Sequence, residues 1–360
     1  MDVGPRWTGR SLPLDDLEHV FQSTRGLWSE LDGARILITG GTGFFGQWLL
    51  GSLLFAARTL RLDLQVVVLT RDAERFRRAA LHIANDPRLR VLVGDVRTFD
   101  LPDERFSHVI HAATDAGTRL NEDDPLLMVS TIVDGTRRVL DLARRHEVRA
   151  LLLTSSGAVY GRQPPDLSCI DETFAGAPDP VRAQSAYGEG KRVAEHLCAL
   201  YHTKFGVPAK IARCFAFIGP GIQLDAQYAI GNFIRDALRG GPIMIKGDGT
   251  PYRSYLHTAD LAVWLWVILL RATPARPYNV GSETAVTIAD LAQRIAARVG
   301  TIVHFADSPA SGVLAERYVP CTARARDELG LKLRIDLDDA LDRTLRWYRG
   351  QGTTSTAVLA

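Results

Sequence analysis

The sequence predicts an α/β protein built on a doubly wound parallel sheet, with a smaller α/β lobe toward its C-terminal end. An apolar strand at 35–39 runs into a glycine-rich turn and then into a helix at 44–57. Apolar strand-length runs then alternate with helical segments as far as residue 214, which is typical of a parallel sheet with helices on both faces. Beyond residue 219, glycine and proline cluster and the helical segments shorten, which indicates a second lobe.

The remaining elements follow from the period of their apolar residues. Apolar positions at helical spacing over 15–31 predict an extra helix beside the first strand. The run 261–270 is about half as long as a membrane span requires, so we expect a buried helix with Trp264 and Trp266 in the core. The other strands are expected at 66–69, 91–93, 109–111, 150–154 and 209–214, and the other helices at 73–83, 126–145 and 187–205.

The composition is that of an ordinary soluble globular protein. The chain has 360 residues, of which 46% are hydrophobic and 23% are charged. A formal net charge of +2 without a basic block argues against a dedicated nucleic-acid binder. No signal segment opens the chain, so we expect a cytoplasmic protein that does not enter a membrane. The cysteines lack metal-ligand spacing, so neither a metal site nor a disulfide is expected at Cys169, Cys198, Cys214 or Cys321.

The turn after the first strand is expected to hold the pyrophosphate of a dinucleotide. Gly40, Gly43 and Gly46 follow a G-x-x-G-x-x-G spacing, which allows a tight turn, a close approach to phosphate and close packing of the helix. The helix that follows points its free N–H groups and positive dipole end at the same place. This strand–turn–helix–strand context favours a Rossmann-type nucleotide site over a plain structural turn. The other turn residues expected beside the cofactor are Thr42, Phe44 and Phe45.

These observations divide the chain into four parts. Residues 34–218 are predicted to form the dinucleotide-binding domain with the catalytic residues, and residues 219–349 mainly the substrate lobe. The lobe is expected to close over the carboxyl edge of the sheet, where ligands of such folds bind. Residues 1–33 are predicted to be a tail with the extra helix, and residues 350–360 a flexible tail.

A tyrosine and a lysine are predicted to act together on one helix face. Tyr187 and Lys191 are four residues apart, so their side chains lie one above the other on a helix. A phenol titrates near ~10, so a phenolate useful at neutral pH must be stabilised by about 3 pKa units, or about 4 kcal/mol. A nearby ammonium and a positively charged nicotinamide ring can supply this in a dry cleft. An ordinary amphipathic pair is the alternative.

Two strand ends carry small and hydroxylated residues. The buried run 151–154 ends at Ser155 and Ser156, at the edge of the sheet where a ligand would lie. A serine there can hydrogen-bond a substrate hydroxyl that loses its proton, although the hydroxyls could simply satisfy a turn. The neighbouring strand ends at 111–113 in small residues that let a cofactor approach.

Together, the glycine turn, the strand-end serines and Tyr-x-x-x-Lys resemble the extended short-chain dehydrogenase/reductases, and specifically the NAD-dependent epimerase/dehydratase family that acts on nucleotide sugars. The similarity covers residues 34–348. It implies tightly bound NAD or NADP and a nucleotide-diphosphate sugar as the substrate. It also implies a homodimer formed through the helices at 126–145 and 187–205.

The resemblance assigns roles to individual positions. Ser156, Tyr187 and Lys191 match the family's catalytic hydroxyl, its base and the helper of that base. Arg213 and Arg253 match arginines that hold the anionic substrate, and Gly157 lies beside Ser156 in the same site. The expected cofactor contacts are Gly40, Gly43 and Gly46, then Asp95 with Val96 at the adenine, the loop His111, Ala112 and Ala113 beneath the phosphates, and Tyr187 and Lys191.

The departures from the family pattern bear on the cofactor and the substrate. An acid usually reads the cofactor ribose at the end of the second strand, but Thr70 occupies that position here and Arg71 follows. Arg71 could pair with a 2′-phosphate, which makes NADP credible, while Asp72 keeps NAD open. Ala216 replaces an asparagine expected to hold the substrate, so the nucleotide is not defined.

The residues after Ser156 discriminate among the reactions of the family. The 4,6-dehydratases that the chain resembles carry Asp-Glu directly after the catalytic hydroxyl, and the uronate decarboxylases use a glutamate two residues before the strand-end tyrosine, Tyr160. Here the positions are Gly157 and Ala158, which cannot move a proton. We therefore expect a nucleotide-sugar epimerase that inverts carbon 4 through a keto intermediate. The alternatives are an NADPH-dependent keto-sugar reductase and a cofactor-binding protein without catalysis.

Overall fold

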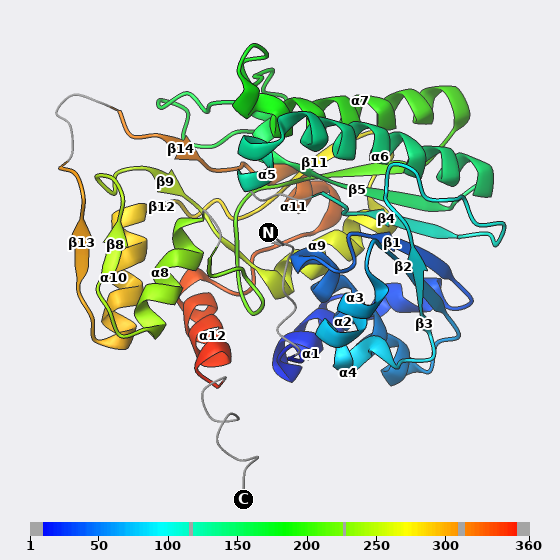
Figure 1. Ribbon diagram of the computed structural model, residues 1–360, viewed down its shortest axis with the longest axis horizontal. Helices are drawn as coiled ribbons and strands as arrows, with labels where there is room; N and C mark the ends of the chain where they lie inside the picture. Colours follow the sequence, from blue (N-terminus) through cyan, green and yellow to red (C-terminus); the bar gives the residue numbers. More distant parts are fainter. Residues whose placement is uncertain (1–9, 115–117, 226–227, 309–313, 351–360) are drawn as a thin grey trace, which may run out of the picture.

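A seven-stranded sheet forms the centre of the protein. The computed structural model describes residues 10–114, 118–225, 228–308 and 314–350. The strands of the sheet are β1 (Arg35–Thr39), β2 (Gln65–Thr70), β3 (Leu89–Val93), β4 (His108–His111), β5 (Ala150–Ser156), β6 (Ala209–Cys214) and β11 (Pro277–Val280). Their spatial order is β11-β6-β5-β4-β1-β2-β3, and every neighbouring pair is parallel (Figure 1). The strand order reverses between β1 and β4, which opens a crevice at their carboxyl ends.

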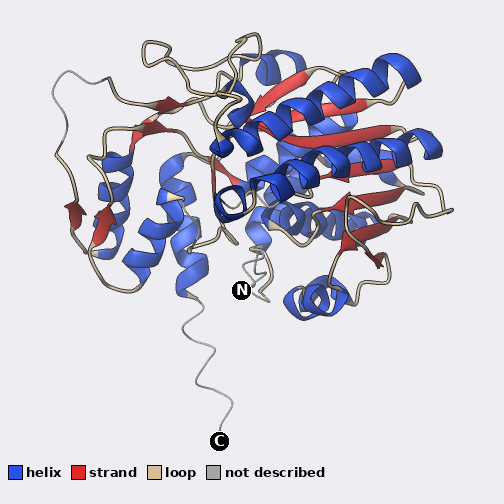
Figure 2. Ribbon diagram, turned by 45° about the horizontal axis from the view of Figure 1, so that its top comes forward, coloured by secondary structure: helices blue, strands red, loops and turns tan. Residues whose placement is uncertain are grey.

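Helices cover both faces of this sheet. The four long helices among them are α2 (Phe44–Leu60), α6 (Pro125–His146), α7 (Ala186–Phe205) and α9 (Thr258–Arg271). Because side chains alternate along a strand, Ile36 and Ile38 face the core under α2 and α9, whereas Leu37 faces the core under α6 and α7. Figures 1 and 2 show these helix layers on opposite sides of the strands. The predicted doubly wound α/β fold is confirmed.

The C-terminal half of the chain builds a smaller lobe and also returns to the large sheet. The lobe lies beside the sheet and contains short strands packed on helices (Figure 2). Its β9 (Tyr252–Arg253) lies between β12 (Val286–Thr287) and β14 (Arg317–Tyr318) in a three-stranded sheet. In contrast, β11 and α9 join the large sheet and its helix layer, so the chain crosses between the two units. The remaining elements of this half are α8 (Ala229–Leu238), β8 (Ile243–Ile245), β9 (Tyr252–Arg253), β10 (Leu256–His257), β12 (Val286–Thr287), α10 (Ile288–Val299), β13 (Val303–Phe305), β14 (Arg317–Tyr318), α11 (Ala323–Leu329) and α12 (Leu337–Arg349).

Two predicted helices are each divided in the structure. The segment 15–31 forms α1 (Leu14–Ser23) and the 3-10 helix η1 (Arg25–Leu31), because the chain turns at Thr24 and its hydroxyl donates to the Val20 carbonyl at 2.6 Å. The segment 73–83 likewise divides at Ala80 into α3 (Ala73–Ala79) and α4 (Leu81–Ala84). The other short elements are α5 (Thr118–Asp123), η2 (Gly157–Tyr160), η3 (Ala183–Ser185) and β7 (Phe217–Ile218).

The predicted buried helix at 261–270 is confirmed within α9. Trp264 is 2% exposed and Trp266 is completely buried, where its indole N–H donates to the Ser52 hydroxyl of α2 at 2.9 Å. Among the residues that the structure describes, no helix is long and apolar enough to cross a membrane. Most of the two predicted tails, at residues 1–9 and 351–360, lie outside the described residues.

Candidate functional site

The glycine turn packs against the neighbouring strand end so tightly that two of its positions exclude a side chain. Gly40 has φ +73°, and a Cβ atom there would lie 2.3 Å from the carbonyl oxygen of Ala112. A Cβ atom on Gly46 would lie 2.4 Å from the Cα atom of Gly41. Gly43 caps α2 in an extended conformation, and its N–H donates to the Gly40 carbonyl at 2.9 Å. A pyrophosphate over the turn would meet the first N–H groups of α2, which have no partner within the helix.

The end of β2 presents an arginine where an acid would contact the cofactor ribose. Asp72 caps α3, because its carboxylate accepts a hydrogen bond from the Arg75 N–H at 2.8 Å. The Asp95 carboxylate accepts hydrogen bonds from Arg97, which hold its pKa below the ordinary value, and the charge of Arg71 adds to this effect. Arg71 itself is exposed. The structure thus places Arg71 and Asp95 on the same side of the predicted cofactor site.

The loop 111–113 contributes its backbone to the same region, while the His111 side chain points into the core. Its Nδ1 atom lies 2.7 Å from the Thr39 hydroxyl, and its Nε2 atom lies 3.0 Å from the Thr136 hydroxyl. Burial lowers the pKa of His111 to about 3, so the ring is neutral. The imidazole therefore links β1, β4 and α6, and a cofactor would meet the backbone of Ala112 and Ala113.

Ser156, Tyr187 and Lys191 come together at the carboxyl end of β5. The Lys191 ammonium is buried and donates to the Thr154 carbonyl at 2.8 Å and to the Thr114 hydroxyl at 2.9 Å. It lies 5.8 Å from the centroid of the Tyr187 ring. Burial lowers the pKa of Lys191 to about 8. Burial also raises the pKa of the Tyr187 phenol, and a hydrogen bond with Ser156 opposes that shift.

Arg213 lies largely in the protein interior, where it already has a carboxylate partner. Its guanidinium forms an ion pair with Glu195 of α7 at 2.7 Å, and it donates to the Tyr160 hydroxyl at 2.8 Å. The side chain of Arg213 is 15% exposed and that of Glu195 is 11% exposed. The Ser155 hydroxyl also donates to Glu195. Binding of a substrate by Arg213 stays a prediction, since β6 turns this side chain toward α7, where Glu195 pairs with its charge.

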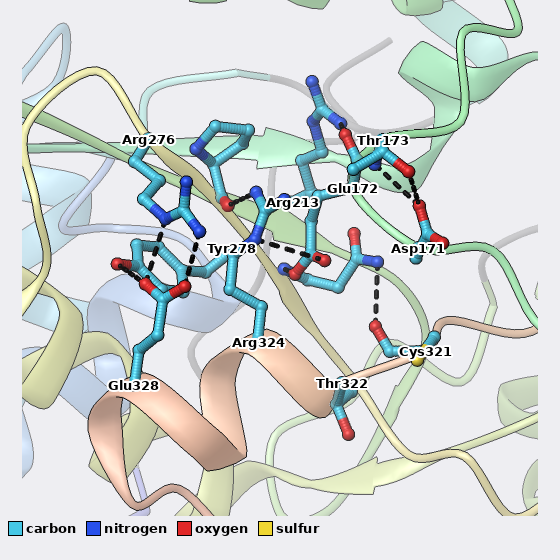
Figure 3. A network of polar contacts seen from close by, with 12 residues as sticks. Asp171, Glu172, Thr173, Arg213, Arg276, Tyr278, Cys321, Thr322, Arg324 and Glu328 are labelled. Carbon is cyan, nitrogen blue, oxygen red and sulfur yellow. Dashed lines mark hydrogen bonds and ion pairs between the residues drawn. The ribbon is translucent and has the colours of Figure 1, made fainter.

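Figure 3 shows how the interior contacts of Arg213 continue toward α11. The Tyr160 hydroxyl donates to the side-chain oxygen of Asn279 at 2.8 Å. The Asn279 amide donates to the carbonyls of Ile170 and Cys321 at 2.9 and 3.0 Å. These contacts join η2, β6 and β11 to the segment before α11.

Arg253 is the arginine that the structure leaves free for an anionic ligand. It lies on β9, where its guanidinium donates to the Tyr252 carbonyl at 2.8 Å. Among the described residues, no carboxylate lies within ion-pair distance of Arg253. It is half-buried, and its charge acts on the Tyr318 phenol, the residue opposite it on β14.

The residue that sequence reasoning missed is Tyr318. It enters the site from β14, and its ring packs on Phe215 with the ring centroids 4.7 Å apart. Its hydroxyl, like that of Tyr187, lies close enough to Ser156 for the serine to oppose the rise in its pKa. A Cβ atom on Gly157 would lie 2.6 Å from the Tyr318 hydroxyl, so Tyr318 explains why Gly157 is a glycine. No periodic pattern marks a strand of two residues, which is why this contact was not predicted.

Comparison with protein families identifies this arrangement. The model of the NAD dependent epimerase/dehydratase family matches residues 36–281. The chain belongs to this family. The predicted family membership is confirmed.

Relatives within the family have more than one activity. UDP-glucuronic acid decarboxylase 1 of Arabidopsis thaliana is 30% identical over 317 residues, which cover 88% of this chain and 70% of the relative. The dTDP-glucose 4,6-dehydratase DesIV of Streptomyces venezuelae, solved with NAD bound, is 25% identical, with a TM-score of 0.74 over 88% of this chain and 97% of DesIV. A UDP-glucose 4-epimerase of Thermotoga maritima shares the fold at 19% identity, with a TM-score of 0.72 over 88% of this chain and 99% of the epimerase.

Proposed function

We propose that the protein is a UDP-sugar 4-epimerase that uses tightly bound NAD or NADP. The observation that supports this most directly is the composition of the site next to Ser156. The cluster of Ser156, Tyr187 and Lys191 can remove a hydroxyl proton, but Gly157 and Ala158 supply no second acid or base. A site of this kind favours oxidation followed by reduction at the same sugar carbon.

The roles of the three residues follow from their charges. Tyr187 takes the proton of the sugar hydroxyl, and Ser156 holds that hydroxyl by a hydrogen bond. Lys191, with a pKa lowered to about 8, is mostly protonated at neutral pH and stabilises the phenolate of Tyr187. Because burial raises the pKa of Tyr187, we infer that the positive charge of an oxidised nicotinamide is also needed. That ring, when bound, would accept the hydride from the sugar carbon and later return it.

The two small residues after Ser156 argue against loss of water. The space above Gly157 is filled by the Tyr318 hydroxyl and by the Phe215 ring, whose nearest atom would lie 2.8 Å from an added Cβ atom. No carboxylate can therefore enter at position 157 without displacing both aromatic rings. The side chain of Ala158 is a methyl group, which can act neither as an acid nor as a base.

Loss of carbon dioxide from a uronate is the second candidate function. It is favoured by the 30% identity to UDP-glucuronic acid decarboxylases. It is opposed by Ala158, which replaces the glutamate expected in such enzymes. A keto-sugar reductase that consumes NADPH is supported by Arg71, which is exposed at the predicted ribose site.

The substrate is proposed to be a nucleoside-diphosphate sugar held by Arg253. This half-buried guanidinium has no carboxylate partner in the described part of the chain, so it can pair with a phosphate. UDP is proposed as the nucleotide because the chain is 30% identical to UDP-glucuronic acid decarboxylase 1 of Arabidopsis thaliana. We further propose a homodimer through α6 and α7, since Val193 and Leu200 expose apolar surface on α7 at 41% and 49%.

An NMR assay with a panel of UDP sugars and no added reduced cofactor tests this proposal. Inversion at carbon 4 without net consumption of cofactor is the expected result, and Tyr187→Phe is expected to abolish it. Release of carbon dioxide from UDP-glucuronate would replace the epimerase with a decarboxylase. Turnover that starts only after addition of a keto sugar and NADPH would replace it with a reductase.

A further inference from the structure

Two cysteines that are far apart in the sequence lie on segments that meet beside the interior network of Arg213. Cys169 belongs to the loop that follows η2, and Cys321 lies between β14 and α11. Figure 3 shows Cys321 on the segment that leads into α11. Both side chains are partly exposed, whereas Cys198 and Cys214 are buried, and all four thiols are free. The accessible thiols of the chain are therefore the two on these segments.

The backbones of the two segments are joined by a short parallel bridge. The Ile170 N–H donates to the Val319 carbonyl at 2.9 Å, and the Cys321 N–H donates to the Ile170 carbonyl at 2.7 Å. The residues that lie opposite each other are Ile170 and Pro320. Cys169 directly precedes the first of them, and Cys321 directly follows the second. The bridge thus places the two cysteines on neighbouring stretches of backbone, which in such a pairing lie about 5 Å apart.

Both thiols lie on the same side of this bridge. Successive side chains along an extended chain point to opposite sides. The Ile170 side chain is 1% exposed and packs with Tyr160 and Phe215 in an apolar cluster. Cys169 and Cys321, each next to a bridge residue, therefore point away from that cluster. In agreement, burial raises the pKa of the Cys321 thiol, and Cys169 lies close enough to add to that rise.

Hydrogen bonds from the surrounding chain hold the two segments in this register. The Asn279 amide donates to the carbonyls of Ile170 and Cys321 at 2.9 and 3.0 Å. The Val319 N–H donates to the side-chain oxygen of Gln163 at 2.9 Å. Because the two thiols are held as neighbours, their reaction with each other costs little loss of freedom and competes well with reaction at a second molecule.

The reaction that suits two neighbouring thiols is oxidation to a disulfide. One thiol, as its thiolate, attacks a sulfur of oxidised glutathione, forms a mixed disulfide and releases one glutathione. The second thiolate then attacks the protein sulfur of the mixed disulfide and releases the other glutathione. The protein gives up two electrons and two protons, and these reduce one oxidised glutathione to two glutathione molecules.

A bond between the two sulfurs would restrain the smaller lobe where it meets the catalytic strand. Tyr318 of β14, whose hydroxyl fills the space above Gly157, lies three residues before Cys321. Cys169 follows η2, which begins at Gly157 itself. Oxidation therefore joins two segments that both lead away from the same part of the site.

We propose that Cys169 and Cys321 are a redox-active pair whose reversible disulfide, formed by a small disulfide oxidant, fastens β14 to the loop after η2. The protein is then modified at these two sulfurs in an oxidising medium and released by a thiol reductant. The proposal concerns the movement of the lobe and is independent of which sugar reaction the protein catalyses.

Treatment of the intact protein with oxidised glutathione, followed by alkylation, trypsin digestion and mass spectrometry, tests the pairing. Cleavage after arginine gives peptides 163–182 and 318–324, each with one cysteine. Wild type is expected to give these peptides joined by a disulfide, at least about tenfold in excess of either peptide bound to glutathione. Alkylated peptides, separate glutathione adducts or a cross-link between two chains would each overturn the proposal.

Cys198→Ala is the matched control, because it removes a thiol that is completely buried. It is expected to retain the cross-link. Cys321→Ser is expected to leave Cys169 as its glutathione adduct, since no second thiol is present to resolve the mixed disulfide. Loss of the cross-link in Cys198→Ala, or its survival in Cys321→Ser, would show that a different pair of cysteines reacts.

Hydrogen–deuterium exchange tests the restraint separately from the pairing. Exchange over residues 314–322 is expected to slow at least about fivefold on oxidation of wild type and to recover with dithiothreitol. Oxidised Cys321→Ser is expected to exchange at the rate of the same variant before oxidation. If the disulfide forms without slowing this exchange, the fastening of β14 is wrong. None of these measurements uses a sugar, so their failure is distinct from failure of the proposed epimerase.

Discussion

Glu195 and Arg213 form a buried ion pair at 2.7 Å that ties the helix carrying Tyr187 and Lys191 to the neighbouring strand β6. The pair is not isolated, since Ser155 donates to Glu195 and Arg213 donates to Tyr160. These neutral groups do not compensate either charge, so each charge is compensated only while the other is present. A buried charge left without its partner is costly, which makes the pair a test of how the site is held in place.

Removal of the carboxylate from this pair is expected to destabilise the protein strongly. Glu195→Ala leaves the Arg213 charge buried and should lower the free energy of unfolding by about 3 to 5 kcal/mol, measured by urea denaturation. Arg105→Ala is the control, because it breaks an exposed pair with Glu147 at 3.4 Å and should cost at most about 1 kcal/mol. If both variants lose the same free energy of unfolding, burial does not increase the contribution of the Glu195–Arg213 pair to stability.

The third glycine of the turn is expected to tolerate no side chain. In Gly46→Ala the new methyl group would lie 2.4 Å from the Gly41 Cα atom, and backbone atoms at this point cannot move aside. We expect cofactor affinity to fall more than about tenfold, measured by fluorescence titration. Gly26→Ala meets no atom within 4 Å and should bind the cofactor like wild type. Unchanged affinity in Gly46→Ala would show that the helix does not need to approach the strand this closely.

Arg71 is expected to contribute to NADP binding and not to NAD binding. Its guanidinium can pair only with a 2′-phosphate, which NAD lacks. Arg71→Ala should weaken NADP roughly tenfold and leave NAD nearly unchanged, as measured by calorimetric titration of both cofactors. Arg78→Ala, also exposed but farther along α3, should change neither affinity. If both cofactors weaken equally, Arg71 contacts a group that they share.

The buried ammonium of Lys191 should make stability rise with pH. Burial lowers its pKa to about 8, whereas an ordinary lysine titrates near ~10.4. Between these two values the unfolded chain binds more protons than the folded protein, so the free energy of unfolding increases with pH across this window. Lys191→Met should reduce that slope, and Lys204→Met, exposed on the same helix, should retain it. Urea denaturation across this range measures both slopes, and identical slopes would contradict the lowered pKa.

The parts of the fold that the sequence predicted are those with a local signal. The consecutive apolar residues Ile36, Leu37 and Ile38 indicate a strand that is buried on both faces. Tyr187 and Lys191 are four residues apart, so a single helix is enough to bring their side chains together. Arg213 was assigned to the substrate because its position matches a family motif, but a motif does not show which way β6 turns. Glu195, four residues after Lys191 on the same helix face, was the available sign of a partner. Tyr318 gave no such sign, because its contact depends on pairing between strands of two residues.

The closeness of Tyr318 to Gly157 leads to a last prediction, on the smallest possible addition to the site. In Gly157→Ala the methyl group would lie 2.6 Å from the Tyr318 hydroxyl and 2.8 Å from the Phe215 ring, so at least one ring must move. Displacement of either ring also disturbs the surroundings of Ser156, the residue before Gly157, and turnover should therefore fall by at least about tenfold. Gly241→Ala meets no atom within 4 Å and should retain full turnover. Steady-state kinetics on the substrate found by the NMR panel measure both variants, and full activity of Gly157→Ala would mean that the two rings move apart without any effect on Ser156.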